Sequence, residues 1–445
     1  MRRRLADLRR SLASPLLRDT LRLQAGQVLL VGIHAARGLL ALRWLGPLAF
    51  GTYALAQSIV TAALLADVTA AGRVALIGAA QALGKERRGD AAAPLADFLR
   101  LATAAGIVLA GALWFLAPSL TALAYRQAGV GDWAGWLGVT LLTDVPFSLL
   151  VVALQAARRT TALVVAETLR AGAWLVVTVA ALLLSDSVAA LVGAQLVVSV
   201  FASAGAAVAY ARFARSEPRL PGWAELLRQA ARRSSRPALA TGARIAVDKN
   251  LGNLAAQLPL LLLGAFDTAA VGQLAAAMRV MGLPGPLLTG VARNLDAVLP
   301  AQAAASREQV RQTFLASTRV VALAWVLVTA VTALLAPLVL VRLLGPAYAP
   351  ALALIPALAV GSVVLGGGVA MGAVFRTLDR VGRSIVCQAT ALAVTMPIGL
   401  LLIGRGGAAG AAWFHALRVA VVTALSLAAV VHLLRPSHGA PTDQA

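Results

Sequence analysis

Long apolar segments separated by short polar connectors recur along nearly the whole chain. Each segment approaches or exceeds the ~20 apolar residues that an α-helix needs to cross a bilayer. The pattern predicts twelve membrane-spanning helices and a short additional helix over 72–83, and it lacks the alternating segments of a transmembrane β-barrel. We expect the spans at 21–45, 48–70, 95–117, 133–156, 161–184, 188–211, 238–263, 269–292, 315–341, 351–375, 384–403 and 409–433.

Basic residues concentrate in every second connector. They precede the first span and follow the second, fourth, sixth, eighth and tenth, whereas the opposite set holds little beyond Arg43, Arg126, Arg342 and Arg405. Lysine and arginine close to the ends of spans stay on the cytoplasmic side. We therefore expect a multi-pass membrane protein with both termini in the cytoplasm. One missed or invented span would destroy this alternation.

The longest polar interruption, 212–237, follows the sixth span. Two prolines and a glycine shortly before Trp223 predict a turn and then a short interfacial helix. Six spans on either side, with weak similarity between 45–56 and 263–276, imply parallel repeats related by an axis along the membrane normal. We expect a basic N-terminal segment 1–20, an N-terminal lobe 21–211, a linker 212–237, a C-terminal lobe 238–433 and a tail 434–445.

The composition agrees with a membrane protein, because 60% of the residues are hydrophobic and only 13% are charged, against about 25% charged in soluble domains. A net charge of +21 would also suit a nucleic-acid partner, but the basic residues follow the positive-inside pattern, so we expect none. Cys387 is the single cysteine, which excludes an intramolecular disulfide and a cysteine-based zinc site. The first apolar segment is too long for a signal peptide and should remain as a span.

Several polar residues interrupt the apolar spans, where each cation costs about 2.5–3.5 kcal/mol at the bilayer centre. In the first span Gln27, His34 and Arg37 fall within about 80° of one another at about 100° per residue. This side of the helix should face a polar cavity, although His34 alone could be a hydrogen-bonded packing residue.

The seventh span is the most polar. Arg244 and Asp248 stand four residues apart and could pair, while Lys249 and Asn253 occupy other faces. Two interpretations stay open. The span either carries a self-neutralised pair near the headgroups or forms a cavity wall that offers cations to an anionic ligand.

Other charged residues are isolated along their spans. Arg279 lies about ten residues into the eighth span. Asp144 has no obvious partner in its own span and could be a proton or cation site or an inter-helix hydrogen-bond acceptor. Glu167 and Arg170 could form a structural pair in the fifth span, and His415 with Arg418 in the twelfth has no assigned role.

The candidate residues form three groups. Predicted anion or diphosphate ligands are Arg37, Arg73, Arg244 and Arg279; predicted coupling or counter-ion groups are Asp67, Asp144 and Asp248; predicted polar cavity residues are Gln27, His34, Lys249 and Asn253. Enzyme motifs such as metal-ligand spacing, a phosphate-binding loop with its lysine or a nucleophile elbow are absent from the sequence. We therefore expect no catalytic residue, no metal and no cofactor.

The connector between the first two spans carries a family resemblance. Arg43-Trp44-Leu45-Gly46-Pro47, followed by Phe50-Gly51-Thr52-Tyr53-Ala54-Leu55, resembles the first external turn of the O-antigen flippases of the polysaccharide biosynthesis family. Segments 155–159 and 343–348 are similar to that family too. Leu65-Ala66-Asp67 is close to the family's Asp-x-Gly, but here the glycine is delayed to Gly72.

This resemblance implies a member of the multidrug/oligosaccharidyl-lipid/polysaccharide (MOP) superfamily. Such proteins have two six-helix lobes in a V shape around a central cavity. The flippases among them carry glycans linked to polyprenyl diphosphate across the inner membrane by alternating access.

We accordingly expect a flippase whose arginines bind the diphosphate bidentately. Its expected partners are the lipid-linked glycan, membrane lipids and glycan polymerase or chain-length proteins, and it should be a monomer. One alternative is a drug/cation antiporter of the multidrug and toxin extrusion type, which would favour an acidic, aromatic cavity. Another is a membrane glycan polymerase or ligase, which the lack of an external connector longer than 118–132 disfavours.

Overall fold

The computed structural model describes residues 15–67, 70–84, 91–125, 128–232, 235–303 and 306–435. Within those ranges the regular structure is entirely helical, which confirms the all-α prediction. The elements are α2 (Pro15–Ala63), η1 (Leu64–Ala66), α3 (Ala71–Gly84), α4 (Ala92–Tyr125), α5 (Ala128–Thr143), α6 (Val145–Ala156), α7 (Thr160–Leu184), α8 (Val188–Ser216), α9 (Trp223–Arg232), α10 (Arg236–Gly264), α11 (Thr268–Gly282), α12 (Gly285–Ala303), α13 (Arg307–Pro337), η2 (Leu338–Leu343), η3 (Pro346–Leu354), α14 (Ile355–Gly368), α15 (Met371–Thr377) and α16 (Val381–Leu433).

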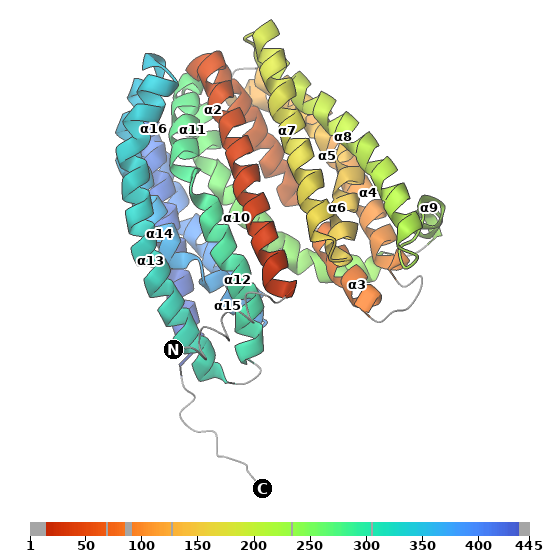
Figure 1. Ribbon diagram of the computed structural model, residues 1–445. Helices are drawn as coiled ribbons and strands as arrows, with labels where there is room; N and C mark the ends of the chain where they lie inside the picture. The colour runs from red at the N-terminus through yellow and green to blue at the C-terminus, as the bar shows by residue number, and fades with distance from the viewer. Residues whose placement is uncertain are drawn as a thin grey trace. The chain divides into compact units, whose positions relative to one another are not determined.

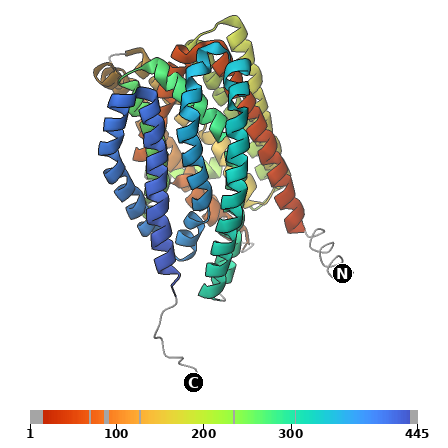
Figure 2. The ribbon, with the colours of Figure 1, turned by 90° about the vertical axis from the view of Figure 1, so that its left-hand side faces the viewer.

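Two of these helices are interrupted by a glycine with positive φ. Gly46 (φ 69°) breaks the 49-residue α2, and Gly407 (φ 53°) breaks the 53-residue α16. The second break is a hairpin, because an added Cβ on Gly399 would overlap Phe414 and one on Gly410 would overlap the carbonyl of Leu402. The two arms of α16 accordingly lie side by side (Figure 2).

The helices reproduce the predicted order of crossings. Within the described residues, seven helices are long and apolar enough to cross a membrane, or up to nine if each of two bent pairs is one span. The pairs are α5 with α6, bent by 42°, and α11 with α12, bent by 52°. If the halves of α2 and α16 are taken separately and the polar, 29-residue α10 is added, twelve crossings result.

The surface of these helices is apolar. Leu184 is 89% exposed, Leu334 79% and Phe115 76%. Large apolar side chains exposed in such numbers indicate contact with lipid rather than water. The chain is therefore a polytopic α-helical membrane protein.

The linker forms the predicted turn and short helix. After α8 ends at Ser216, the chain turns and enters α9 (Figure 1). The Tyr210 hydroxyl donates to the Pro221 carbonyl at 2.8 Å, and the Trp223 indole donates to the Ala207 carbonyl at 3.0 Å. A hydrogen bond from Arg219 (2.7 Å) lowers the pKa of the Glu217 carboxyl, which keeps this acceptor ionised in the turn.

Contacts divide the chain into two compact units, Met1–Gly272 and Gln273–Ala445. The core of the first includes Leu95, Leu149 and Tyr210, and that of the second includes Phe314 and Phe375. The division falls inside α11, so that α10 is counted with the first unit. The lobe boundaries expected from the sequence stay a prediction.

Two glycines of the first unit allow a backbone-to-backbone helix contact. An added Cβ on Gly51 would overlap the Thr268 carbonyl oxygen, and one on Gly272 would overlap the Pro47 carbonyl oxygen. The contact is reciprocal, since each glycine lies against the residue four positions before the other. Reciprocity of this kind is expected where similar segments meet about a two-fold axis. Gly51 lies in the segment 45–56 and Gly272 in the similar segment 263–276.

We predict that Gly51→Ala and Gly272→Ala each destabilise the protein, because the methyl group would meet backbone atoms that no side-chain rotation can move. Overpacking of this kind costs about 1–3 kcal/mol. The thermal unfolding temperature of the purified variants measures the effect. Gly32→Ala in the same α2 is the control, since nothing lies within 4 Å of its added Cβ. Unfolding temperatures that are equal for all three variants would contradict the prediction.

Candidate functional site

The predicted cation of the first span is stacked on an aromatic ring of another helix. The guanidinium carbon of Arg37 in α2 lies 3.4 Å from the ring centroid of Trp174 in α7. His34, one turn earlier, meets the same indole edge-on, with 6.0 Å between ring centroids. A cation–π contact contributes about 0.5–2 kcal/mol. It uses the face of the guanidinium and leaves the in-plane N–H directions to other partners.

Arg37 and His34 therefore contact the same indole, and the polar cavity predicted on this side of the helix stays a prediction. His34 is exposed and Arg37 is half-buried. The structure adds Trp174, which the sequence analysis did not select. Trp174 follows Arg170 by one helical turn on α7, but nothing in its spacing indicates that it meets a residue of α2.

Asp144 has an ion pair on a different helix. It lies between α5 and α6, and its Oδ2 accepts from the Arg170 guanidinium of α7 at 2.5 Å. Its Oδ1 accepts from the Ser199 hydroxyl of α8 at 2.5 Å, and Ser199 shares a further hydrogen bond with Thr143. Of the two interpretations of Asp144, this favours the inter-helix contact. Arg170 thus pairs with Asp144 and not with Glu167.

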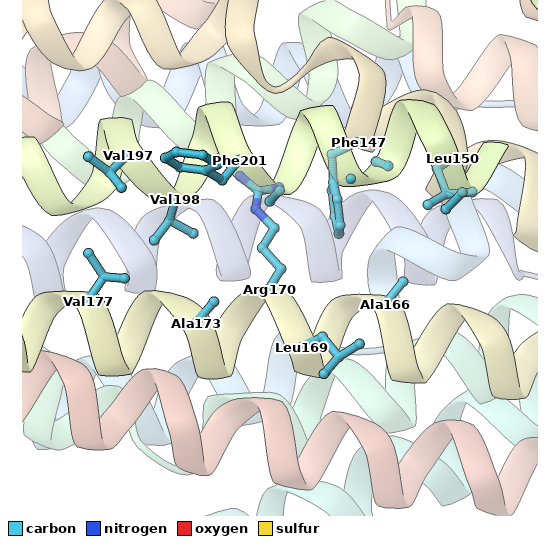
Figure 3. Close-up of a pocket in the computed structure, with 14 residues that line it drawn as sticks. Phe147, Leu150, Ala166, Leu169, Arg170, Ala173, Val177, Val197, Val198 and Phe201 are labelled. Carbon is cyan, nitrogen blue, oxygen red and sulfur yellow. The ribbon is translucent and has the colours of Figure 1, made fainter. Parts of the chain in front are cut away.

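A cavity of about 530 Å³ adjoins this ion pair. Arg170 extends from α7 toward α8, between the rings of Phe147 and Phe201 (Figure 3). Its guanidinium carbon lies 4.4 Å from the Phe147 ring centroid. The rest of the lining, contributed by α6, α7 and α8, is apolar. Such a lining suits a hydrocarbon chain better than a hydrated sugar, because it offers few hydrogen-bonding groups.

The polar face of α10 contacts the end of α2 and the segment after it. Asn250 is buried, and its side-chain amide donates to the Asp67 carbonyl at 2.7 Å. Further along α10, Gln257 accepts from the Ser58 hydroxyl at 2.9 Å. Asn253 and Asp248 are half-buried, whereas Lys249 is exposed. These hydrogen bonds account for two of the polar side chains of the seventh span, Asn250 and Gln257.

The remaining candidates occupy separate places. Arg73 is exposed in the first turn of α3. Arg279 belongs to the second unit and lies half-buried in the last turn of α11, before the bend. The side chains of Arg244 and Gln27 lie outside the described residues. The Arg244–Asp248 pair and the diphosphate-binding role of all four arginines therefore stay predictions.

We predict a coupled response to loss of the Asp144–Arg170 pair. Asp144→Leu or Arg170→Leu alone leaves a partly buried charge, so each should destabilise the protein by an amount near the lower end of the about 3–5 kcal/mol that breaking a buried pair costs. The double Leu variant should recover most of the loss, and thermal unfolding measures all three. Arg212→Leu, at an exposed position of α8, is the control. Additive losses in the double variant would show that the two side chains do not interact.

Comparison with known proteins agrees with these observations. A family model described as polysaccharide biosynthesis protein matches residues 39–353. No functionally curated protein sequence matches the chain.

Solved structures with the same fold are membrane transporters. An inward-facing multidrug resistance MATE family transporter of the MOP superfamily aligns with a TM-score of 0.73 at 15% identity, over 92% of this chain and 94% of that one. A MOP superfamily transporter from Pyrococcus furiosus, described by a binding pocket of reversed polarity, gives 0.69 at 17%, over 94% and 95%. A MATE protein in complex with MaL6 gives 0.69 at 16%, over 94% and 96%.

At these identities the structural likeness establishes the fold alone. The family model, in contrast, covers more than half of the sequence. It includes the Leu45-Gly46-Pro47 turn and the Asp144–Arg170 pair, and it begins two residues after Arg37. The chain belongs to the polysaccharide biosynthesis protein family and has the fold of the MOP superfamily.

Proposed function

We propose that this protein is a flippase that moves a polyprenyl-diphosphate-linked oligosaccharide across the bacterial inner membrane by alternating access. The family match supports a role in polysaccharide biosynthesis, and the fold supports transport. The observation that carries the substrate assignment is the stack of Arg37 on Trp174. A cation held within an apolar helix bundle favours an anionic substrate.

The chemistry of the proposed substrate fits this stack. A diphosphate has oxygens on every side and accepts in-plane N–H bonds from a guanidinium. Because the indole already covers one face of Arg37, the side chain is oriented before the substrate arrives, which lowers the entropy lost on binding. Arg73, Arg244 and Arg279 are proposed as further diphosphate ligands, and the exposed His34 as a hydrogen-bonding neighbour.

The three acidic candidates have different proposed roles. The ion pair of Asp144 with Arg170 and its bond from Ser199 support a structural role. Asp67 and Asp248 are proposed as the groups that release the arginines between transport cycles or couple transport to an ion. Lys249 and Asn253 would belong to the hydrated part of the path.

The competing functions make different demands. A drug/cation antiporter would need acidic groups around its substrate, whereas Arg37 brings a positive charge to the stack. A glycan polymerase or ligase would need a set of catalytic residues, and the sequence lacks the enzyme motifs named above. We further propose that the protein is a monomer, that its termini are cytoplasmic, and that glycan polymerase or chain-length proteins act with it.

Reconstituted transport tests the function. Purified protein in liposomes that contain a fluorescent polyprenyl-diphosphate oligosaccharide should expose the glycan to a membrane-impermeant glycosidase. We expect Arg37→Ala to lower the initial rate about tenfold or more, equivalent to at least about 1.4 kcal/mol of substrate interaction. Arg37→Lys should retain part of the rate, since it keeps the charge but loses the planar donors.

Two controls make the result specific. Arg43→Ala removes a cation from the same helix at an exposed position and should transport at the wild-type rate. Trp174→Phe keeps an aromatic face under Arg37 and should lose less activity than Trp174→Ala. If Arg37→Ala transports the labelled glycan normally, the diphosphate site is elsewhere; if the unaltered protein transports cationic dyes and not this glycan, the flippase proposal is wrong.

A further inference from the structure

A second cavity, of about 460 Å³, lies within the second unit. Its walls come from α12, α14, α15 and both arms of α16. Unlike the cavity beside Arg170, it has several hydrogen-bonding side chains in its lining. They are Thr289, Ser384, Gln388, Arg418, Thr423 and Ser426.

Among the residues that the structure describes, Arg418 is the only charged member of that lining. Its side chain is deeply buried, with 9% of the residue exposed. Its Nε atom is buried and has no hydrogen-bond partner within the part of the chain that the structure describes. No aspartate or glutamate lines the cavity among those residues. Asp296 of the neighbouring α12 is already bonded to Arg376, through donors at 2.7 and 3.1 Å.

The polar groups follow the helix periodicity. Ser384 and Gln388 are one turn apart on the first arm of α16, and the Gln388 amide donates to Ser384 at 3.4 Å. Arg418, Val422 and Ser426 are spaced four residues apart on the second arm, so they line one face over about 12 Å. Gly368 and Gly285 of the opposite walls add no side chain to the space. Polar side chains of both arms of α16 thus share this lining with apolar residues, and Arg418 supplies its positive charge.

We propose that this cavity is a binding site for a phosphoryl anion, with Arg418 as its principal ligand. A buried guanidinium with no aspartate or glutamate in the described lining is stabilised by an anion that binds beside it. Thr423 and Ser426 of the second arm of α16 and Thr289 of α12 place hydroxyl groups in the same lining. A tetrahedral oxyanion has acceptors for donors from several directions, whereas the acceptors of a carboxylate lie in one plane.

This site is independent of the proposed flippase activity. It belongs to the second unit, whereas Arg37 and Trp174 belong to the first, and its occupation is measurable without any glycan. The phosphoryl group could come from inorganic phosphate or from the headgroup of an anionic lipid. Both sources present phosphoryl oxygens to Arg418, and the lipid composition of the membrane distinguishes them in the experiment.

The first arm of the experiment uses inorganic phosphate. The full-length protein in phosphatidylcholine nanodiscs is titrated with phosphate, with sodium chloride at equal ionic strength as the reference, and thermal unfolding is followed by tryptophan fluorescence. A ligand that binds only the folded state raises the unfolding temperature saturably. Arg418→Met should weaken the response about tenfold or more, and Arg418→Lys should be intermediate because it lacks the planar fork. Arg405→Met, on the same helix at an exposed position, should respond as the unaltered protein does.

Variants that keep Arg418 protect the test against a folding defect. Thr423→Val preserves the volume of the side chain and removes a hydroxyl, so the phosphate response should weaken several-fold while the unliganded unfolding temperature changes little. Gly285→Leu adds a side chain where the ideal Cβ has no heavy atom within 4 Å, and it should lower the response by filling the cavity. Equal responses of the unaltered protein to phosphate and chloride in phosphatidylcholine, together with no Arg418-dependent stabilisation by an anionic lipid, overturn the proposal. So does an undiminished response in folded Arg418→Met and Thr423→Val.

The second arm replaces part of the phosphatidylcholine by phosphatidylglycerol. If the anionic lipid raises the unfolding temperature of the unaltered protein but not of Arg418→Met, and suppresses the response to added phosphate, the occupant is the lipid phosphate diester. If the phosphate response is unchanged by phosphatidylglycerol, the occupant is the free anion. Both results support an Arg418 phosphoryl site.

Discussion

An ionised side chain within a bilayer has no water to solvate it, so other protein groups must take the place of that water. In the first unit two such replacements join different helices. Arg37 of α2 lies on Trp174 of α7, and Asp144 joins Arg170 of α7 to Ser199 of α8. The polar residues therefore determine which helices are neighbours, a task for which interchangeable apolar side chains are poorly suited.

Close approach of backbones completes the packing. Lipid tails are as apolar as leucine, so helices in a membrane gain little from burying large apolar side chains against each other. Where Gly51 and Gly272 meet the carbonyls of Thr268 and Pro47, there is no room for even a methyl group. In the hairpin of α16, Gly410 likewise meets the Leu402 carbonyl, whereas Gly399 leaves room for the ring of Phe414. These glycines keep backbone dipoles and van der Waals surfaces in contact, which polar side chains alone would not achieve.

The features that depend on neighbouring residues along the chain were predictable. Span positions, the bend after Gly282, the helix at 71–84 and the helix after the linker turn all follow from local composition. The partners of the charged residues were not, because helical spacing describes only one helix. Asp144 and Arg170 are 26 positions apart, and Glu167 was the only acid within helical reach of Arg170. The sequence identifies Arg418 as a charge within the twelfth span but gives it no role, since its significance depends on a cavity made by five helical segments.

The two cavities show why compensation of charge is a better guide to ligand binding than size. The larger one, beside Arg170, has its charge neutralised by Asp144 and is otherwise apolar, so a polar ligand would exchange bulk water for a surface with few hydrogen bonds. The smaller one combines an arginine whose Nε lacks a described partner with hydroxyls from α12 and from both arms of α16. A buried charge without a partner costs more free energy than a charge that is paired, as Arg170 is in the larger cavity. It is stable in the folded protein only if the cavity admits water or an anion, and both carry oxygen acceptors to Arg418.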